Sequence, residues 1–90
     1  MTVYWTDDAL EQVMAISQLL AVTSPQFAER IVTNLFDRVR PLADHPNMGS
    51  VYKKAGLTQV RELLVKPYRI VYYVGRKQVD IIAVLHQSQR

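Results

Sequence analysis

The sequence predicts an α+β fold in which an N-terminal helical hairpin packs on one face of a small, mainly antiparallel twisted sheet. Two observations support this prediction. Apolar residues recur at helical spacing over about the first 42 residues, and three short stretches rich in Val, Ile, Leu and Tyr follow from residue 60 onward. Helices followed by sequential strands are typical of this class. We expect one domain over residues 1–90, because the chain is too short for two.

The N-terminal part is predicted to hold a short strand and two helices. Residues 2–5 are β-prone and are expected to join the sheet at an edge, and Thr6, followed by two aspartates, suits the start of a helix. The helical pattern breaks at Ser24 and Pro25, which are expected to begin a second, antiparallel helix. The apolar stripe of that helix comprises Ala28, Ile31, Val32, Leu35, Val39 and Leu42.

The C-terminal half is predicted to form a polar loop and three strands. Residues 45–59 are expected to be a polar, basic loop, since Pro46 ends the second helix and Gly49 permits a turn. The strands are short, rich in β-branched and aromatic residues, and separated by turns at 66–68 and 75–78. They are Val60–Val65, Arg69–Val74 and Val79–His86.

The charges are unevenly distributed along the chain. Residues 1–44 hold 3 basic and 6 acidic residues (net −3), whereas residues 45–90 hold 8 basic and 2 acidic residues (net +6). A basic half of this kind suits either an acidic protein or a phosphate backbone. A core of this size stabilises a fold only modestly, and the chain has no cysteine for disulfides, so we expect a partner chain to contribute.

The sequence offers little sign of targeting or of cofactor chemistry. The first residues form no basic and apolar leader, and nowhere do about 18 apolar residues follow one another, so we expect a cytoplasmic protein without a membrane partner. It holds no glycine-rich phosphate loop and no cluster of Cys and His ligands, and its two histidines are His45 and His86. We expect neither a cofactor nor a metal.

The last two strands predict one candidate site. If Arg76 and Lys77 form a two-residue turn, Arg69 lies opposite Val84, and His86 is its diagonal neighbour on the face away from the helices. An arginine can clamp phosphate oxygens while an imidazole transfers a proton. Other interpretations stay open, because Arg69 can simply cover apolar surface and His86 can bond the backbone at a strand end. A loop longer by one residue would separate the two side chains.

Other residues of the basic half are candidates for contact with a partner. Their simpler interpretation is solubility, or in the case of Arg61 beside Glu62 a surface ion pair, which contributes little stability. The complete set of candidates for target or partner binding is Lys53, Lys54, Arg61, Arg69, Tyr73, His86 and Arg90.

Four segments in this order carry a resemblance: Asp44-His-Pro-Asn-Met-Gly49, Val60-Arg-Glu-Leu63, Tyr68-Arg-Ile-Val-Tyr72 and Val79-Asp-Ile-Ile-Ala-Val-Leu-His86. Together they resemble the ParE/RelE superfamily of toxins, and in particular the ParE-like plasmid stabilisation proteins of type II toxin–antitoxin systems. Each motif alone is degenerate, but their succession over nearly the whole chain is fairly specific. The resemblance implies a toxin wrapped by the C-terminal segment of a cognate antitoxin in a hetero-oligomer.

Within the superfamily, ParE-like branches inhibit DNA gyrase, whereas RelE-like branches cleave mRNA on the ribosome. The resemblance favours gyrase, because the two strand lysines of the nucleases correspond here to Val60 and Glu62, and a carboxylate opposes binding of a phosphate. Arg69 matches the central arginine of the nucleases, and Arg90 lies near their C-terminal one. An mRNA endoribonuclease using Arg69, His86 and Arg61 is therefore the alternative, and an inactive homologue that only binds antitoxin is a third.

Overall fold

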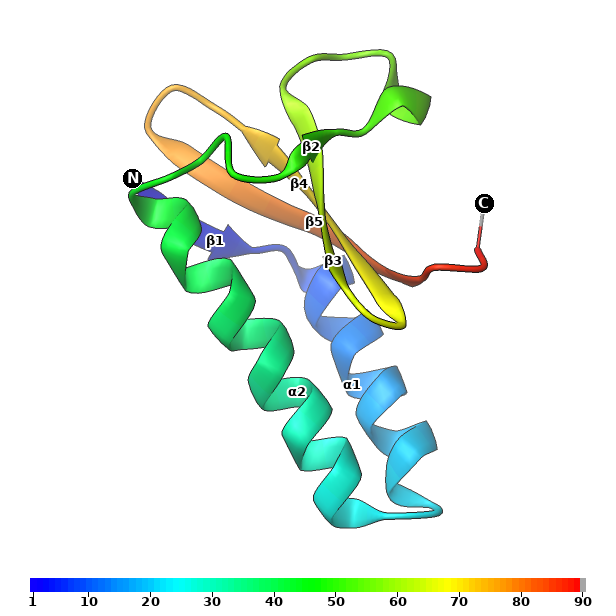
Figure 1. The fold of residues 1–90 in the computed structure, drawn as a ribbon. Helices are drawn as coiled ribbons and strands as arrows, with labels where there is room; N and C mark the ends of the chain where they lie inside the picture. The colour runs from blue at the N-terminus through cyan, green and yellow to red at the C-terminus, as the bar shows by residue number, and fades with distance from the viewer. Residues whose placement is uncertain (90) are drawn as a thin grey trace.

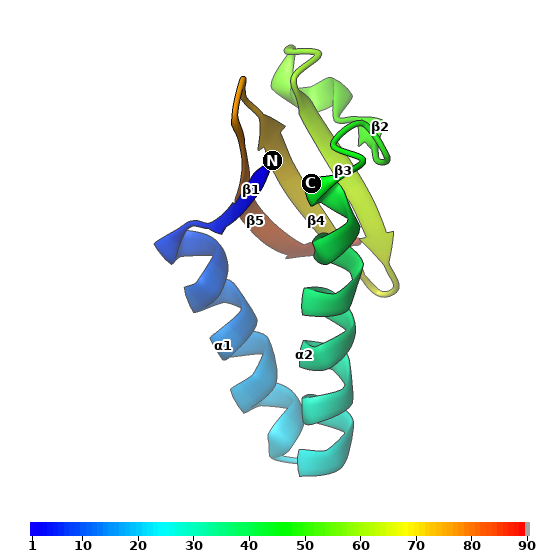
Figure 2. The same cartoon turned by 90° about the vertical axis from the view of Figure 1, so that its left-hand side faces the viewer.

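The computed structural model describes residues 1–89 and confirms the α+β prediction (Figure 1). A sheet with the strand order β1-β5-β4-β3-β2 is covered on one face by the hairpin of α1 and α2 (Figure 2). The elements in chain order are β1 (Thr2–Trp5), α1 (Asp7–Ala21), α2 (Pro25–Val39), the 3-10 helix η1 (Arg40–Ala43), β2 (Ser50–Val51), the 3-10 helix η2 (Lys53–Ala55), β3 (Val60–Val65), β4 (Tyr68–Val74) and β5 (Gln78–His86).

Both helices begin at the residues that the sequence predicts. The hydroxyl of Thr6 accepts a hydrogen bond from the backbone N–H of Ala9 at 3.3 Å, and the hydroxyl of Ser24 accepts one from Phe27 at 3.2 Å. These contacts satisfy N–H groups that have no partner inside a helix. Pro25 occupies the first turn of α2, where its missing N–H costs nothing.

The second helix is shorter than predicted. Its apolar stripe is buried as expected, except that Val32 is half-buried, but the α-helix ends at Val39 and the chain continues as η1. Pro41 accounts for this change, because it has no N–H to donate to the carbonyl four residues earlier. Leu42 nevertheless remains fully buried, so the tighter turn continues the stripe of α2 onto the sheet.

The hydrophobic core lies between the sheet and the sheet-proximal part of the hairpin. Leu35 of α2, Ile70 of β4 and Ile81 of β5 are completely buried within it. The tip of the hairpin projects beyond the sheet (Figures 1 and 2), and there Leu19 and Val22 are 73% and 86% exposed. Within residues 1–89 no helix is long and apolar enough to cross a bilayer.

The two outer strands complete the sheet in different ways. β1 joins at an edge, as predicted, and runs parallel to β5, with Trp5 beside Ile81. The segment expected to be a loop contains the two-residue strand β2, which pairs with Arg61 and Glu62 of β3. The remaining pairs, β3 with β4 and β4 with β5, are antiparallel.

A bulge in β5 changes which side chains share a face of the sheet. The predicted two-residue turn at Arg76 and Lys77 implies the pairs Val74–Val79 and Tyr72–Ile81, and both are present. The next pair is Val71–Ala83, so one residue of β5 has no partner on β4. The prediction of uninterrupted alternation was therefore wrong beyond Ile81. The backbone N–H and the hydroxyl of Thr6 both donate to the Ile81 carbonyl, at 3.1 and 2.7 Å, where β1 gives way to α1. This junction lies directly beside the bulge.

Candidate functional site

Arg69 lies on the face of the sheet that the helices leave open. Its partner on β3 is Leu64, and its partner on β5 is Leu85 rather than the predicted Val84. Its Nε lies 3.5 Å from a carboxylate oxygen of Glu62, and both side chains are about four-fifths buried. That distance is long for a hydrogen bond, and the buried Nε has no hydrogen-bond partner among the described residues. Arg69 and Glu62 are therefore close enough for an electrostatic interaction, but the Nε–H of Arg69 has no acceptor among the described residues.

His86 lies on the opposite face, beside α1. Its β4 partner is Tyr68, and the two rings meet edge to face with centroids 5.8 Å apart. The imidazole Nδ1 is 2.7 Å from the Ser88 hydroxyl, and the backbone N–H of His86 donates to the Gln89 side chain at 2.6 Å. A cleft of about 310 Å³ separates this strand end from α1.

The predicted pairing of Arg69 with His86 is therefore not formed. The bulge moves Val84 and His86 to the helix-facing side, so the guanidinium and the imidazole point away from each other across the sheet. A longer turn is not the cause, since the turn itself has the predicted register from Val74 and Val79. The structure thus does not bring a phosphate clamp and an imidazole together.

Arg61 is engaged with the backbone of the loop that follows η1. Its guanidinium donates to the Gly49 carbonyl at 2.7 Å and to the Asn47 carbonyl at 3.3 Å. It shares its face of the sheet with its β4 partner Tyr72, which is fully buried. The Tyr72 hydroxyl donates to the Pro46 carbonyl and accepts from the Gly49 N–H, both at 2.9 Å. Two side chains thus fix the loop to the sheet.

Tyr72 was not among the residues predicted to matter. Burial raises its pKa above the ordinary 10.0, although the Gly49 hydrogen bond and the positive charge of Arg61 act in the opposite direction. It therefore keeps its proton and its donor at neutral pH. The sequence signal was a tyrosine at an inward position of a buried strand, because such a hydroxyl needs a partner.

The other candidates are divided between the open face and a nearby turn. Tyr73, partner of Val60 and Asp80, is 37% exposed on the open face. Lys53 and Lys54 form part of η2 and line a cleft of about 320 Å³ together with Val51, Tyr52, Glu62 and Arg69. Arg90 lies outside the described residues.

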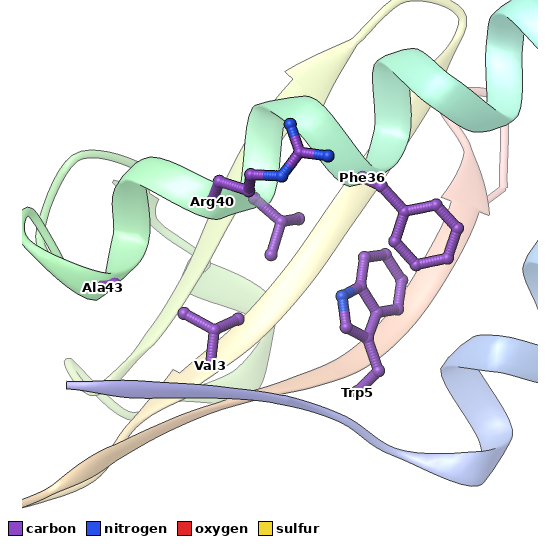
Figure 3. Close-up of a pocket in the computed structure, with 6 residues that line it drawn as sticks. Val3, Trp5, Phe36, Arg40 and Ala43 are labelled. Carbon is purple, nitrogen blue, oxygen red and sulfur yellow. The ribbon is translucent and has the colours of Figure 1, made fainter.

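A third surface cleft, of about 420 Å³, lies between β1 and α2 (Figure 3). The rings of Trp5 and Phe36 face each other there, with centroids 4.6 Å apart, and Val3 and Ala43 extend the apolar wall. Arg40 is the one charged residue of its lining and forms an ion pair with Asp37. None of the residues predicted from the sequence to bind a target or partner lies in the lining of this cleft. Across residues 1–89, His, Asp and Glu side chains form no group of three suited to a metal.

Comparison with known proteins agrees with this geometry. The family described as "ParE toxin of type II toxin-antitoxin system, parDE" matches residues 3–90. "Toxin RelE2" of Caulobacter vibrioides is 33% identical over 88 residues, which span 97% of this chain and 96% of that protein. A chain of the chromosomal ParDE TA system from P. aeruginosa has the same fold, with a TM-score of 0.81 and 24% identity over 96% of this chain and 95% of that one. This chain therefore belongs to the ParE toxin family of type II toxin–antitoxin systems.

Proposed function

We propose that this protein is the toxin of a type II toxin–antitoxin module, that it inhibits DNA gyrase by binding, and that a cognate antitoxin neutralises it. The observation that carries the choice of target is the separation of Arg69 from His86 on opposite faces of the sheet. Cleavage of RNA needs a phosphate clamp and a proton-transfer group within reach of the same phosphodiester. Inhibition by binding needs only a well-defined surface.

The loop at residues 45–49 supplies such a surface. Tyr72 and Arg61 fix its backbone through four hydrogen bonds, so its shape is set before any partner arrives. His45, Asn47 and Met48 are exposed on it, and Met48 is 44% accessible. A preorganised loop loses little conformational entropy on binding, which favours affinity. We assign the gyrase contact to this loop.

The hairpin supports an antitoxin partner. Large apolar side chains of α1, the turn after it and the start of α2 face solvent, which is unusual for a stable monomer and typical of an interaction surface. A segment that folds on binding can cover such a surface. The exposed residues are Leu10, Met14, Leu19, Val22 and Phe27.

A supercoiling assay with purified gyrase, relaxed plasmid and ATP tests the choice of target. We expect the wild-type protein to inhibit supercoiling, Met48→Asp to weaken the inhibition, and His86→Ala to leave it unchanged. The first substitution alters the exposed loop, whereas the second alters a residue at the other end of β4 and β5, where His86 pairs with Tyr68. Full supercoiling at a large excess of folded protein would exclude gyrase as the target.

The endoribonuclease alternative rests on Arg69, and the Arg69–Glu62 contact argues against it. Glu62 holds a fixed negative charge 3.5 Å from the guanidinium that would have to clamp phosphate. Primer extension on mRNA from cells expressing the protein would reveal codon-linked cuts. We expect none, and cuts that disappear in Arg69→Ala would establish the nuclease instead.

A further inference from the structure

We infer that the cleft at Arg69 receives a carboxylate from an acidic segment of the antitoxin, and that Glu62 occupies part of the same site in its absence. This inference rests on the proposed function for the existence of the antitoxin, but not on gyrase as the target. The net positive charge of the chain indicates only that it can attract an acidic partner, whereas the cleft at Arg69 gives that attraction a defined place of contact.

The cleft concentrates positive charge. The turn η2 forms one wall with Lys53 and Lys54, and the open face of the sheet forms the other with Arg69 and Glu62. Three cationic side chains thus meet one carboxylate, which leaves a formal excess of two positive charges within a cleft of about 320 Å³. A cavity of this size admits the side chain of one Asp or Glu together with a stretch of peptide backbone.

The contact of Arg69 with Glu62 is incomplete. A guanidinium has five N–H donors, and a well-formed pair with a carboxylate uses two of them at less than about 3 Å. Here Glu62 approaches Nε at 3.5 Å, and that buried atom has no hydrogen-bond partner within residues 1–89. A finished structural ion pair would satisfy this donor, because a buried unsatisfied group is costly. The buried Nε cannot be reached from solvent, so a second acceptor would bind the other guanidinium N–H groups, in a side chain that is 22% exposed.

The same geometry favours a single carboxylate over a phosphodiester chain. A nucleic acid carries a charge at every nucleotide and would bring several of them close to Glu62. An isolated Asp or Glu side chain places one charge among three cations and can also contact the apolar wall at Val51 and the ring of Tyr52. The imidazole of His86 lies on the other face, so a phosphate bound here would gain no proton-transfer group from it.

Two substitutions of opposite expected effect test the inference. Binding of the purified cognate antitoxin is measured by calorimetry at several salt concentrations. Arg69→Gln is expected to weaken binding about tenfold or more, as for loss of one charge-assisted hydrogen bond. Glu62→Gln is expected to tighten binding about two- to fivefold, because it removes the competing carboxylate. A purely structural role of the ion pair predicts weaker binding for both variants.

The matched control for the charge change is Asp80→Asn. Asp80 lies on the same face as Glu62 but is bonded to Gln78 at 2.5 Å and does not line the cleft. This control is expected to leave affinity unchanged, whereas an increase equal to that of Glu62→Gln would attribute the effect to net charge and overturn the inference. Because Arg69→Gln could perturb folding, the double variant Lys53→Gln/Lys54→Gln on the exposed turn provides a second test, with weaker and less salt-dependent binding expected.

Three other outcomes separate the failures. If the wild-type protein does not bind the antitoxin, the part of the proposed function that concerns an antitoxin partner is refuted. If it binds but no cleft variant changes the affinity, the inference alone fails. A short single-stranded RNA that displaces the antitoxin, and that loses this ability in Arg69→Gln, would assign the cleft to phosphodiesters and refute the carboxylate. If the protein does not inhibit gyrase, but Arg69→Gln weakens and Glu62→Gln tightens antitoxin binding, the proposed target is refuted and the inference stands.

Discussion

Replacing Tyr72 with phenylalanine removes one oxygen atom that holds the 45–49 loop. The hydroxyl is buried, donates to the Pro46 carbonyl and accepts from the Gly49 N–H, both at 2.9 Å. The ring itself remains, so the packing between β4 and the helices is kept. Only Arg61, through the Gly49 and Asn47 carbonyls, would still attach the loop to the sheet.

The expected cost follows from the two groups left behind. The buried Gly49 N–H loses its acceptor, at about 1–3 kcal/mol, whereas the half-buried Pro46 carbonyl can turn to water, at about 0.5–1 kcal/mol. The free energy of unfolding should therefore fall by about 1.5–4 kcal/mol. For a chain of 90 residues this corresponds to a decrease in Tm of roughly 6–30 °C.

Urea unfolding followed by the fluorescence of Trp5, the single tryptophan, measures the change. The matched control is Tyr73→Phe, which removes the hydroxyl of the neighbouring, 37% exposed tyrosine and should alter the unfolding free energy by less than about 0.5 kcal/mol. A loss below that value in Tyr72→Phe, with an unchanged dependence on urea, would refute the role of the hydroxyl in fixing the loop.

Three further changes are expected, two from the contacts of Tyr72 with the loop and one from a contact between α1 and β5. Gly49→Ala should destabilise the protein by about 3 kcal/mol or more in the urea experiment, because a β-carbon there would collide with the Glu62 carbonyl and the Tyr72 hydroxyl. Unfolded tyrosine ionises near pH 10, whereas folded Tyr72 has a raised pKa, so its contribution is complete below pH 10 and lost at higher pH. The urea midpoints of the wild type and Tyr72→Phe should therefore approach each other above pH 10. Gln12→Ala should cost about 1–2 kcal/mol and accelerate amide exchange at Val84, whose N–H donates to Gln12 at 2.7 Å.

The sequence predicted the elements whose signals are local. Caps at Thr6 and Ser24, the Pro25 start and the stripe of α2 each depend on neighbours within a few residues, and the structure places all of them as expected. The hairpin register at Val74 and Val79 was predictable for the same reason, since the intervening turn is short.

What the sequence could not supply depends on contacts between distant segments. The bulge lies in an uninterrupted apolar run, Ile81-Ile82-Ala83-Val84, without a glycine or proline to mark it. Its position beside Thr6 becomes visible only when β1 lies against β5. Likewise, the strand pattern places Tyr72 on the inward face and Tyr73 on the outward face, but it does not identify the partner of the Tyr72 hydroxyl, because the loop that Tyr72 binds is 23 to 26 residues away.

The bulge has a consequence for how insertions and deletions act in this fold. Beyond it, Ala83, Val84, Leu85 and His86 keep their partners on β4 because one residue, Ile82, is left out of the pairing. Deleting Ile82 would therefore shorten β5 without exchanging the faces of the residues that follow it. Pulling the same residue into the ladder would exchange them all and set His86 on the side of Arg69. In this sheet, a one-residue change of chain length at the bulge therefore need not change the face on which each following side chain lies. Relatives that differ by one residue here can still present the same surfaces.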